Sequence, residues 1–289
     1  MYKLFLDSDC DVDLEFCKKH NASLISMPYI VDDKVIYPYK DFEKFDGKAF
    51  YDSLRGGKMP TTCALSIEEY IEYFEKEFKE GNDILYIHFS RAMTATFNMM
   101  DEALKQLQEK YPDRKLIDID TKGITICSYH FICEALDLLD KGMTPEELKE
   151  YAKSEVDKSA CYFFADDLKF FKRSGRVSGL AAFMGGLIGI RPIIFMDDKG
   201  VMRSIGKEKG LNKSIAKLVE YVETLGDDVK NHHFIIGHTD SLEIALKVKD
   251  ALEAKFGKDL NTEIVIVNPT AGSHCGPNGV GIAFHAIHR

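Results

Sequence analysis

The chain has 289 residues, of which 45% are hydrophobic and 29% charged, so it is long enough to bury a sizeable core. Its formal net charge of −9 at pH 7 argues against a broad nucleic-acid surface and against binding to anionic membranes. Its seven cysteines form no CxxC pair, and their odd number and scattered spacing indicate a reducing compartment rather than a disulfide framework.

The first 160 residues alternate between strand and helix patterns. Short apolar runs predict the strands, and two capping boxes, Ser66 with Glu69 and Thr144 with Glu147, mark helix starts. Strands are expected at 2–9, 22–31, 34–39, 83–90 and 115–121, and helices at 66–81, 94–111, 124–139 and 145–158. This alternation predicts an α/β domain with a parallel sheet, in which Pro28 and Pro38 mark bends or edges.

The pattern changes near residue 160. Strands are expected at 160–167, 232–240 and 262–269, a hairpin at 191–210, and helices at 213–226 and 241–257. The hairpin turn falls at Asp198-Lys199-Gly200. The second half therefore predicts an α+β domain, and we expect an N-terminal α/β domain at 1–160 and a C-terminal α+β domain at 161–289.

An unusual segment lies between these halves. The basic residues Lys169, Lys172, Arg173 and Arg176 come just before an apolar, glycine-rich run from Gly179 to Ile190. Each part has an ordinary interpretation, a solvated charged face and a closely packed core segment. Side by side, they would also suit a ligand with an anionic head and a long apolar tail.

No segment predicts a membrane span or a signal peptide. The apolar stretch from Ser178 to Ile190 is too short and too rich in glycine to cross a bilayer. The N-terminus turns acidic at Asp7 and has no signal-peptide core. We expect a cytoplasmic protein without stable membrane insertion.

Four polar groups follow predicted strands, where parallel sheets bind ligands. They are Asp7-Ser8-Asp9, Pro60-Thr61-Thr62, Ser90 to Thr96, and the glycine-rich stretch around His274 and Cys275. The hydroxyl groups of the third set would also serve as plain helix caps, and the second set on its own is a loop with hydroxyl groups. His232 and His233 have no third ligand at a useful spacing, so no metal site is expected.

Taken in chain order, five motifs resemble the DegV family of bacterial fatty-acid-binding proteins. The segments LDSDCDV, MPTTCALS and FSRAMTATFN are similar to the family's DS(T)AD(L), PTTSQPS and ISSxLSGTY. Nearer the C-terminus, LKFFKRSGRVS and GSHCGPNGVGIAF are similar to LxYLxxGGRIS and GTHTGPGALGIAF. The chain departs from these motifs at Cys63-Ala64-Leu65, Thr94, Ala95 and Cys275, where the family has SQP, serine, glycine and threonine.

The resemblance implies two domains that clasp one long-chain fatty acid between them. It also implies a carboxylate site made by Thr61, Thr62, Thr94, Arg176 and His274. By the same resemblance, the protein carries the fatty acid, or its acyl-phosphate, for a separate kinase subunit related to dihydroxyacetone kinases. The kinase would phosphorylate the carboxylate and so feed phospholipid synthesis, and the carrier itself would have no catalytic residue, metal or cofactor.

Two other functions stay open from the residues alone. One is a thiol-dependent acyl transferase or hydrolase with Cys275 or Cys63 as nucleophile and His274 as base. Neighbours on a strand point to opposite faces, so a His274–Cys275 pair would need an irregular loop. The other is a binding module for a different amphiphile or a small anion, without a kinase partner. Met93, Phe183, Met184 and Phe195 are candidate tail contacts, or else core residues.

Overall fold

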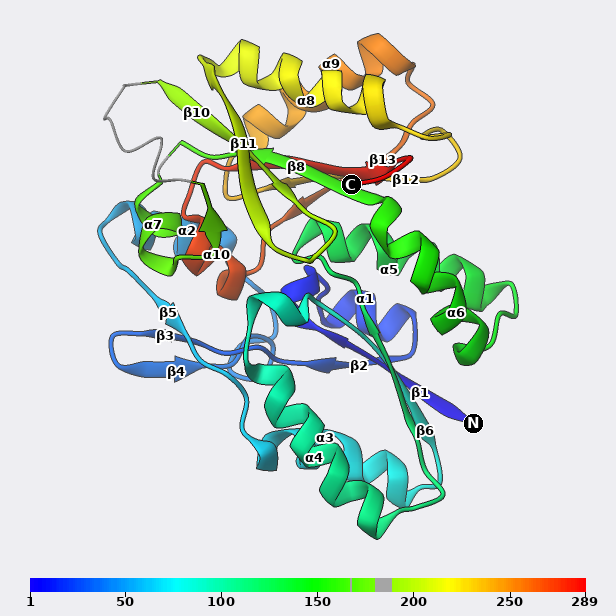
Figure 1. Ribbon diagram of the computed structural model, residues 1–289. Helices are drawn as coiled ribbons and strands as arrows, with labels where there is room; N and C mark the ends of the chain where they lie inside the picture. Colours follow the sequence, from blue (N-terminus) through cyan, green and yellow to red (C-terminus); the bar gives the residue numbers. More distant parts are fainter. Residues whose placement is uncertain (167, 180–188) are drawn as a thin grey trace.

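Residues 1–166, 168–179 and 189–289 are described by a computed structural model of the chain (Figure 1). Its first sheet is wholly parallel, with the strand order β2-β1-β6-β7. The strands are β1 (Tyr2–Asp7), β2 (Ala22–Ile25), β6 (Asp83–His88) and β7 (Leu116–Asp120). The predicted alternation of strand and helix in this half is confirmed.

The helices that follow these strands carry the strongest local sequence signals. The capping boxes of Ser66 and Thr144 both form, and they start α3 and α6 at the expected positions. The helices of this half are α1 (Leu14–Lys19), α2 (Gly47–Arg55), α3 (Ile67–Lys79), α4 (Thr96–Lys110), α5 (Ile126–Asp140) and α6 (Pro145–Glu155). Three short 3-10 turns add η1 (Ser8–Cys10), η2 (Arg91–Met93) and η3 (Val156–Lys158).

The second sheet is mixed and has the order β13-β12-β14-β8-β10-β11-β9. Its strands are β8 (Ser159–Phe164), β9 (Val177–Ser178), β10 (Ile190–Met196), β11 (Met202–Lys209), β12 (His233–His238), β13 (Asn261–Ile266) and β14 (Val280–His285). The predicted hairpin is confirmed, because β10 and β11 pair antiparallel across the turn. Helices α8 (Leu211–Leu225) and α9 (Leu242–Phe256) cover its outer face (Figure 1).

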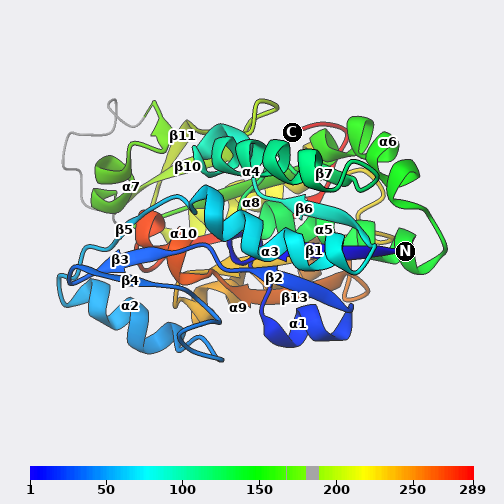
Figure 2. The same cartoon turned by 90° about the horizontal axis from the view of Figure 1, so that it is seen from below.

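A third, small sheet was not expected. It has the order β4-β3-β5, with strands β3 (Tyr29–Val31), β4 (Lys34–Ile36) and β5 (Thr61–Thr62). It gathers with α2, α7 (Lys169–Ser174) and α10 (Pro269–Cys275) at the end of the molecule away from α6 (Figure 2). Helix α10 contacts β3, β5, α2 and α7, so this group joins segments from both halves of the chain.

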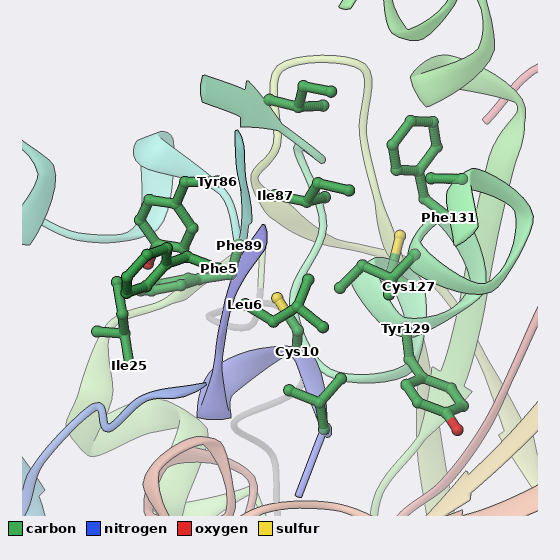
Figure 3. Close-up of a cluster of buried hydrophobic side chains, with 14 of the residues drawn as sticks. Phe5, Leu6, Cys10, Ile25, Tyr86, Ile87, Phe89, Cys127, Tyr129 and Phe131 are labelled. Carbon is green, nitrogen blue, oxygen red and sulfur yellow. The ribbon is translucent and has the colours of Figure 1, made fainter. Parts of the chain in front are cut away.

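Helix α5 lies in the core that connects the two large sheets. Its residues from Ile126 to Cys133 are all buried, which is typical of a helix segment enclosed on several sides, and its acidic residues Glu134, Asp137 and Asp140 lie in its C-terminal half. Its side chains join those of β1 and β6 in one hydrophobic cluster (Figure 3). It also contacts β8, β12 and β14 of the second sheet. The domain boundary near residue 160 stays a prediction, since α5 precedes it and packs on both sides.

Candidate functional site

A cavity lies between the carboxyl end of the first sheet and the inner face of the second. The space between its lining atoms is about 1030 Å³, which includes a part open to solvent. It lies by the junction of β1 and β6, where the strand order reverses, which is the expected place for a ligand. Apolar side chains from both halves form most of the wall, among them Phe89, Met93, Phe163, Met196 and Met202.

A polar pair stands on this wall where β5 meets α10. The Thr62 hydroxyl lies 2.9 Å from Nε2 of His274, and both residues line the cavity. Burial, and then the charges of Arg176 and Arg173, lower the pKa of His274 to about 4. The imidazole is therefore neutral at pH 7, so its two ring nitrogens are one donor and one acceptor. Its Nδ1 is buried and has no hydrogen-bond partner among the described residues.

Thr94 and Arg176 complete the polar end of the cavity. The Thr94 hydroxyl lines the cavity and accepts a hydrogen bond from the Thr96 amide at 3.1 Å. The Arg176 side chain also lines it, is exposed, and donates to the Ser174 carbonyl at 3.1 Å. Four of the five expected site residues therefore line one cavity, from β5, the turn between η2 and α4, the segment after α7, and α10.

Thr61 is the fifth, and it lies apart from the other four. It is exposed, pairs with Ile30 in the small sheet, and does not contribute to the cavity wall. Successive side chains of a strand point to opposite faces, so Thr61 faces away when Thr62 faces inward.

Arg173 is a residue whose role the sequence did not reveal. Its guanidinium donates to the carbonyls of Met59 and Pro60, just before β5, and to the Ser273 carbonyl of α10 at 3.1 Å. It thus fastens the strand that carries Thr62 to the helix that carries His274. The sequence shows Arg173 only as a member of the basic cluster with Lys169, Lys172 and Arg176. The spacing of these residues does not distinguish an arginine that positions two elements from one that is exposed to solvent.

The other hydroxyl groups of these motifs have structural partners. Thr96 accepts a hydrogen bond from the Leu65 amide at 3.0 Å and pairs with the Tyr70 hydroxyl at 3.1 Å. Ser90 donates to the Gly200 carbonyl at 2.8 Å, across the two halves of the chain. These bonds fix the loop and the hairpin that border the cavity.

The residues of the acidic motif after β1, Asp7, Ser8 and Asp9, have different roles. Asp7 is buried and accepts hydrogen bonds from the Phe89 amide at 3.2 Å and the Tyr86 hydroxyl at 3.1 Å, which links β1 to β6. Ser8 accepts from the Met27 amide at 2.9 Å. Only Asp9 of the three lines the cavity.

The residues predicted as candidate contacts for the ligand's tail lie in different parts of the structure. Met93 lines the cavity. Phe195 stacks on Tyr162 at 5.8 Å and packs against the outer cluster under α8 and α9 instead. Phe183 and Met184 lie outside the described residues, as does most of the apolar run from Gly179 to Ile190.

Neither candidate cysteine has the setting of an activated nucleophile. Burial, and then the nearby Asp11 and Asp9 carboxyls, raise the pKa of Cys275 to about 12. Burial also raises the pKa of Cys63, although that residue is exposed at the surface. The stretch that carries His274 and Cys275 is the helix α10, not the irregular loop that such a catalytic pair would need. Thiols protonated at neutral pH do not favour the thiol-enzyme hypothesis.

Two glycines of this stretch allow other parts of the protein to pack closely against it. A Cβ on Gly272 would lie 2.5 Å from the Tyr51 hydroxyl, and one on Gly276 would lie 2.2 Å from the Phe170 ring. Gly276 also has a φ of 70°, which a residue with a side chain rarely adopts. The close approach of α10 to α2 and α7 therefore depends on these glycines.

Replacing Gly276 with alanine is expected to lower the free energy of unfolding by about 1–3 kcal/mol. The added methyl group overlaps Phe170, which belongs to a small cluster with Tyr51 and Leu54. Chemical denaturation followed by fluorescence measures this. Gly57→Ala has a similar positive φ but no atom within 4 Å, so it reports the backbone cost alone. Equal losses in both variants would contradict the steric argument.

The described residues contain no group of three or more His, Cys, Asp or Glu side chains that could hold a metal ion. His232 and His233 instead lie next to acidic residues of α5, at 3.2 Å from Glu134 and 3.1 Å from Asp137. No helix within the described part of the chain has the length and apolar character of a membrane span.

Comparison with known proteins places the whole chain in one group. The DegV family matches residues 1–286. A DegV domain-containing protein of Clostridium perfringens is 28% identical over 284 residues, which cover 98% of this chain and 97% of the relative. One from Streptococcus pyogenes is 24% identical over 282 residues, covering 97% and 96%.

Solved structures share the fold at lower identity. A stearic acid-binding protein from Eubacterium ventriosum has a TM-score of 0.87 at 20% identity, covering 99% of this chain and 98% of its own. A fatty-acid-binding DegV family protein from Thermus thermophilus has a TM-score of 0.85 at 18% identity, covering 99% of both chains. A DegV family protein from Ruminococcus gnavus with vaccenic acid has a TM-score of 0.84 at 17% identity, covering 98% and 99%.

Proposed function

The chain belongs to the DegV family, and on that premise we propose that it binds one long-chain fatty acid in the cavity between its two large sheets. The observation that carries the proposal is an apolar cavity with a polar set of Thr62, Thr94, Arg176 and His274 on its wall. Three solved relatives described above bind or contain fatty acids, which supports the same ligand class here.

The binding energetics of a fatty acid require both an apolar wall for the tail and polar groups for the carboxylate, and the cavity has both. Burying about 15 methylene groups at ~0.8 kcal/mol each contributes on the order of 12 kcal/mol before the costs of immobilisation. A carboxylate buried with them needs hydrogen-bond donors, because an unpaired buried charge is strongly unfavourable. We assign that role to the hydroxyl groups of Thr62 and Thr94, the neutral imidazole of His274 and the guanidinium of Arg176.

We further propose that the bound fatty acid is presented to a separate kinase subunit. Arg176 is exposed at the cavity wall, and the polar set is thus close to the surface. A kinase could transfer the terminal phosphoryl group of ATP to one carboxylate oxygen while the tail stays buried. The acyl-phosphate product would then supply phospholipid synthesis. All seven cysteines are free thiols, which supports our placing the protein in the cytoplasm.

Native mass spectrometry of the purified protein tests the binding proposal. We expect a co-purifying mass of one long-chain fatty acid, or a delipidated protein that gains one such mass when fatty acid is added. A protein that neither carries nor acquires a fatty acid would refute the proposal. Adding hydroxylamine to a mixture of loaded protein, ATP and a candidate kinase subunit then tests the second step, since it traps an acyl-phosphate as a hydroxamate.

A further inference from the structure

Asp9 is a buried acid on the cavity wall whose side chain has no assigned role. The residue is 6% exposed, and its Oδ1 has no hydrogen-bond partner among the described residues. Its backbone, in contrast, is fully used. The Asp9 amide donates to Asp7 Oδ1 at 3.0 Å, and its carbonyl accepts from the Thr125 amide at 2.7 Å. The backbone therefore fixes the position of Asp9 without using its carboxyl group.

This acid lies on a different element from the head-group set, although η1 and α10 contact each other. Asp9 lies on η1 and is bonded to the start of α5, whereas Thr62 and His274 lie on β5 and α10. The charges that act on His274 are those of Arg176 and Arg173. The pKa of Asp9 is raised by burial and then by Asp7 and Asp11, with no arginine among the causes. The cavity thus has a second polar position, whose acid is not paired with either arginine.

A plain hydrocarbon tail would leave this second position unpaired. Buried polar groups in proteins nearly always have a hydrogen-bond partner, and those that do not are markers of a ligand, a water or a function. Burial among other acids favours the neutral carboxylic acid, which both donates and accepts a hydrogen bond. Thr125, another hydroxyl-bearing residue, lines the cavity beside it. In the family motif quoted above, threonine stands at the position of Asp9.

We propose that Asp9 pairs with a neutral oxygen group on the acyl chain, so that this protein selects an oxygenated long-chain fatty acid, such as a hydroxy fatty acid. The inference rests on the proposed function and narrows its ligand class. A matched hydrogen bond at a site that is otherwise left unpaired is expected to favour the oxygenated ligand by about tenfold.

Binding to the delipidated full chain tests this, with octadecanoic acid and a positional series of monohydroxy-octadecanoic acids as probes. We expect at least one positional isomer to bind about tenfold more tightly than octadecanoic acid. Asp9→Leu keeps the branched shape without polar atoms and is expected to abolish that preference. Asp9→Asn keeps the shape and the hydrogen-bonding capacity and is expected to retain the preference for the hydroxy fatty acid. Comparing the two variants distinguishes the loss of a hydrogen bond from a general loss of folding.

The outcomes separate this inference from the proposed function. If octadecanoic acid binds and no hydroxy isomer binds more tightly, the inference is overturned and the proposed function stands. If no fatty acid of either kind binds, the proposed function fails as well. Tighter binding of an amino fatty acid than of every hydroxy isomer would overturn the assignment of a neutral partner to Asp9.

Discussion

Replacing Thr62 with valine is expected to weaken the binding of a long-chain fatty acid by about ten- to a hundredfold. Valine keeps the shape of threonine but removes the hydroxyl group that lies 2.9 Å from Nε2 of His274. The bound carboxylate would lose a donor, and His274, whose Nδ1 has no partner among the described residues, would lose the partner of its Nε2. A hydrogen bond to a charged group contributes about 1.5–3 kcal/mol, and each 1.4 kcal/mol corresponds to a factor of ten.

The neighbouring residue supplies a matched control for this experiment. Thr61→Val makes the same chemical change one position earlier, at an exposed site outside the cavity wall. Titration of delipidated protein with fatty acid below its micelle concentration compares the two variants. We expect Thr61→Val to lose less than about twofold. Equal losses in both would show that the carboxylate site extends to both threonines, as the family resemblance implies.

The parallel sheet and the hairpin could be predicted because their signals are local. Strands such as Asp83–His88 are continuous apolar runs, and the capping boxes of Ser66 and Thr144 form within four residues. Helix α10 could not be predicted in this way. It is seven residues long and contains glycine, so its stability comes from contacts with α2 and α7 rather than from helix propensity.

The candidate site likewise depends on contacts between residues that are far apart in the sequence, which local sequence patterns do not reveal. Thr62 and His274 are 212 residues apart in sequence and meet only in the folded chain. The motifs predicted that pair by resemblance, since residues alone left several functions open. Asp9 and Arg173 were visible only as members of charged clusters. Their roles depend on which carboxyl of a turn faces the cavity and on which carbonyls an arginine reaches, and sequence spacing does not specify either.

Replacing Asp11 with asparagine is expected to stabilise the protein at neutral pH by up to about 4 kcal/mol. Burial raises the pKa of Asp11 from an ordinary value of 3.8 to about 7, despite hydrogen bonds from the amide and the side chain of Asn268. The residue is half-buried overall, but its Oδ2 is buried and unpaired among the described residues. Asparagine keeps an acceptor for Asn268 and suits the φ of 57° at this position.

The stabilisation should depend on pH in a defined direction. Below about pH 4, Asp11 is protonated in both the folded and the unfolded chain, so the two proteins should be equally stable. As the pH rises from 3.8 towards about 7, the unfolded wild type loses its proton first, and its folded state becomes less favourable. A pKa that rises from 3.8 to about 7 on folding costs the wild type about 4 kcal/mol of folding stability at neutral pH. The variant has no carboxyl group at this position and avoids this cost.

The pH dependence due to Asp11 is measured by the difference in the free energy of unfolding between the variant and the wild type. The wild-type pH profile alone does not isolate it. Burial lowers the pKa of His274 to about 4 and that of His130 to about 3, so both histidines destabilise the fold as the pH falls below 6.5. These contributions oppose that of Asp11 in the wild type but are the same in the variant, and they cancel in the difference. Urea denaturation of both proteins at pH 4, 5.5 and 7.5 should therefore show a gap that widens with pH. A gap that is constant or narrows would mean that the Asp11 carboxyl is ionised in the folded chain, held by a partner that outweighs its burial.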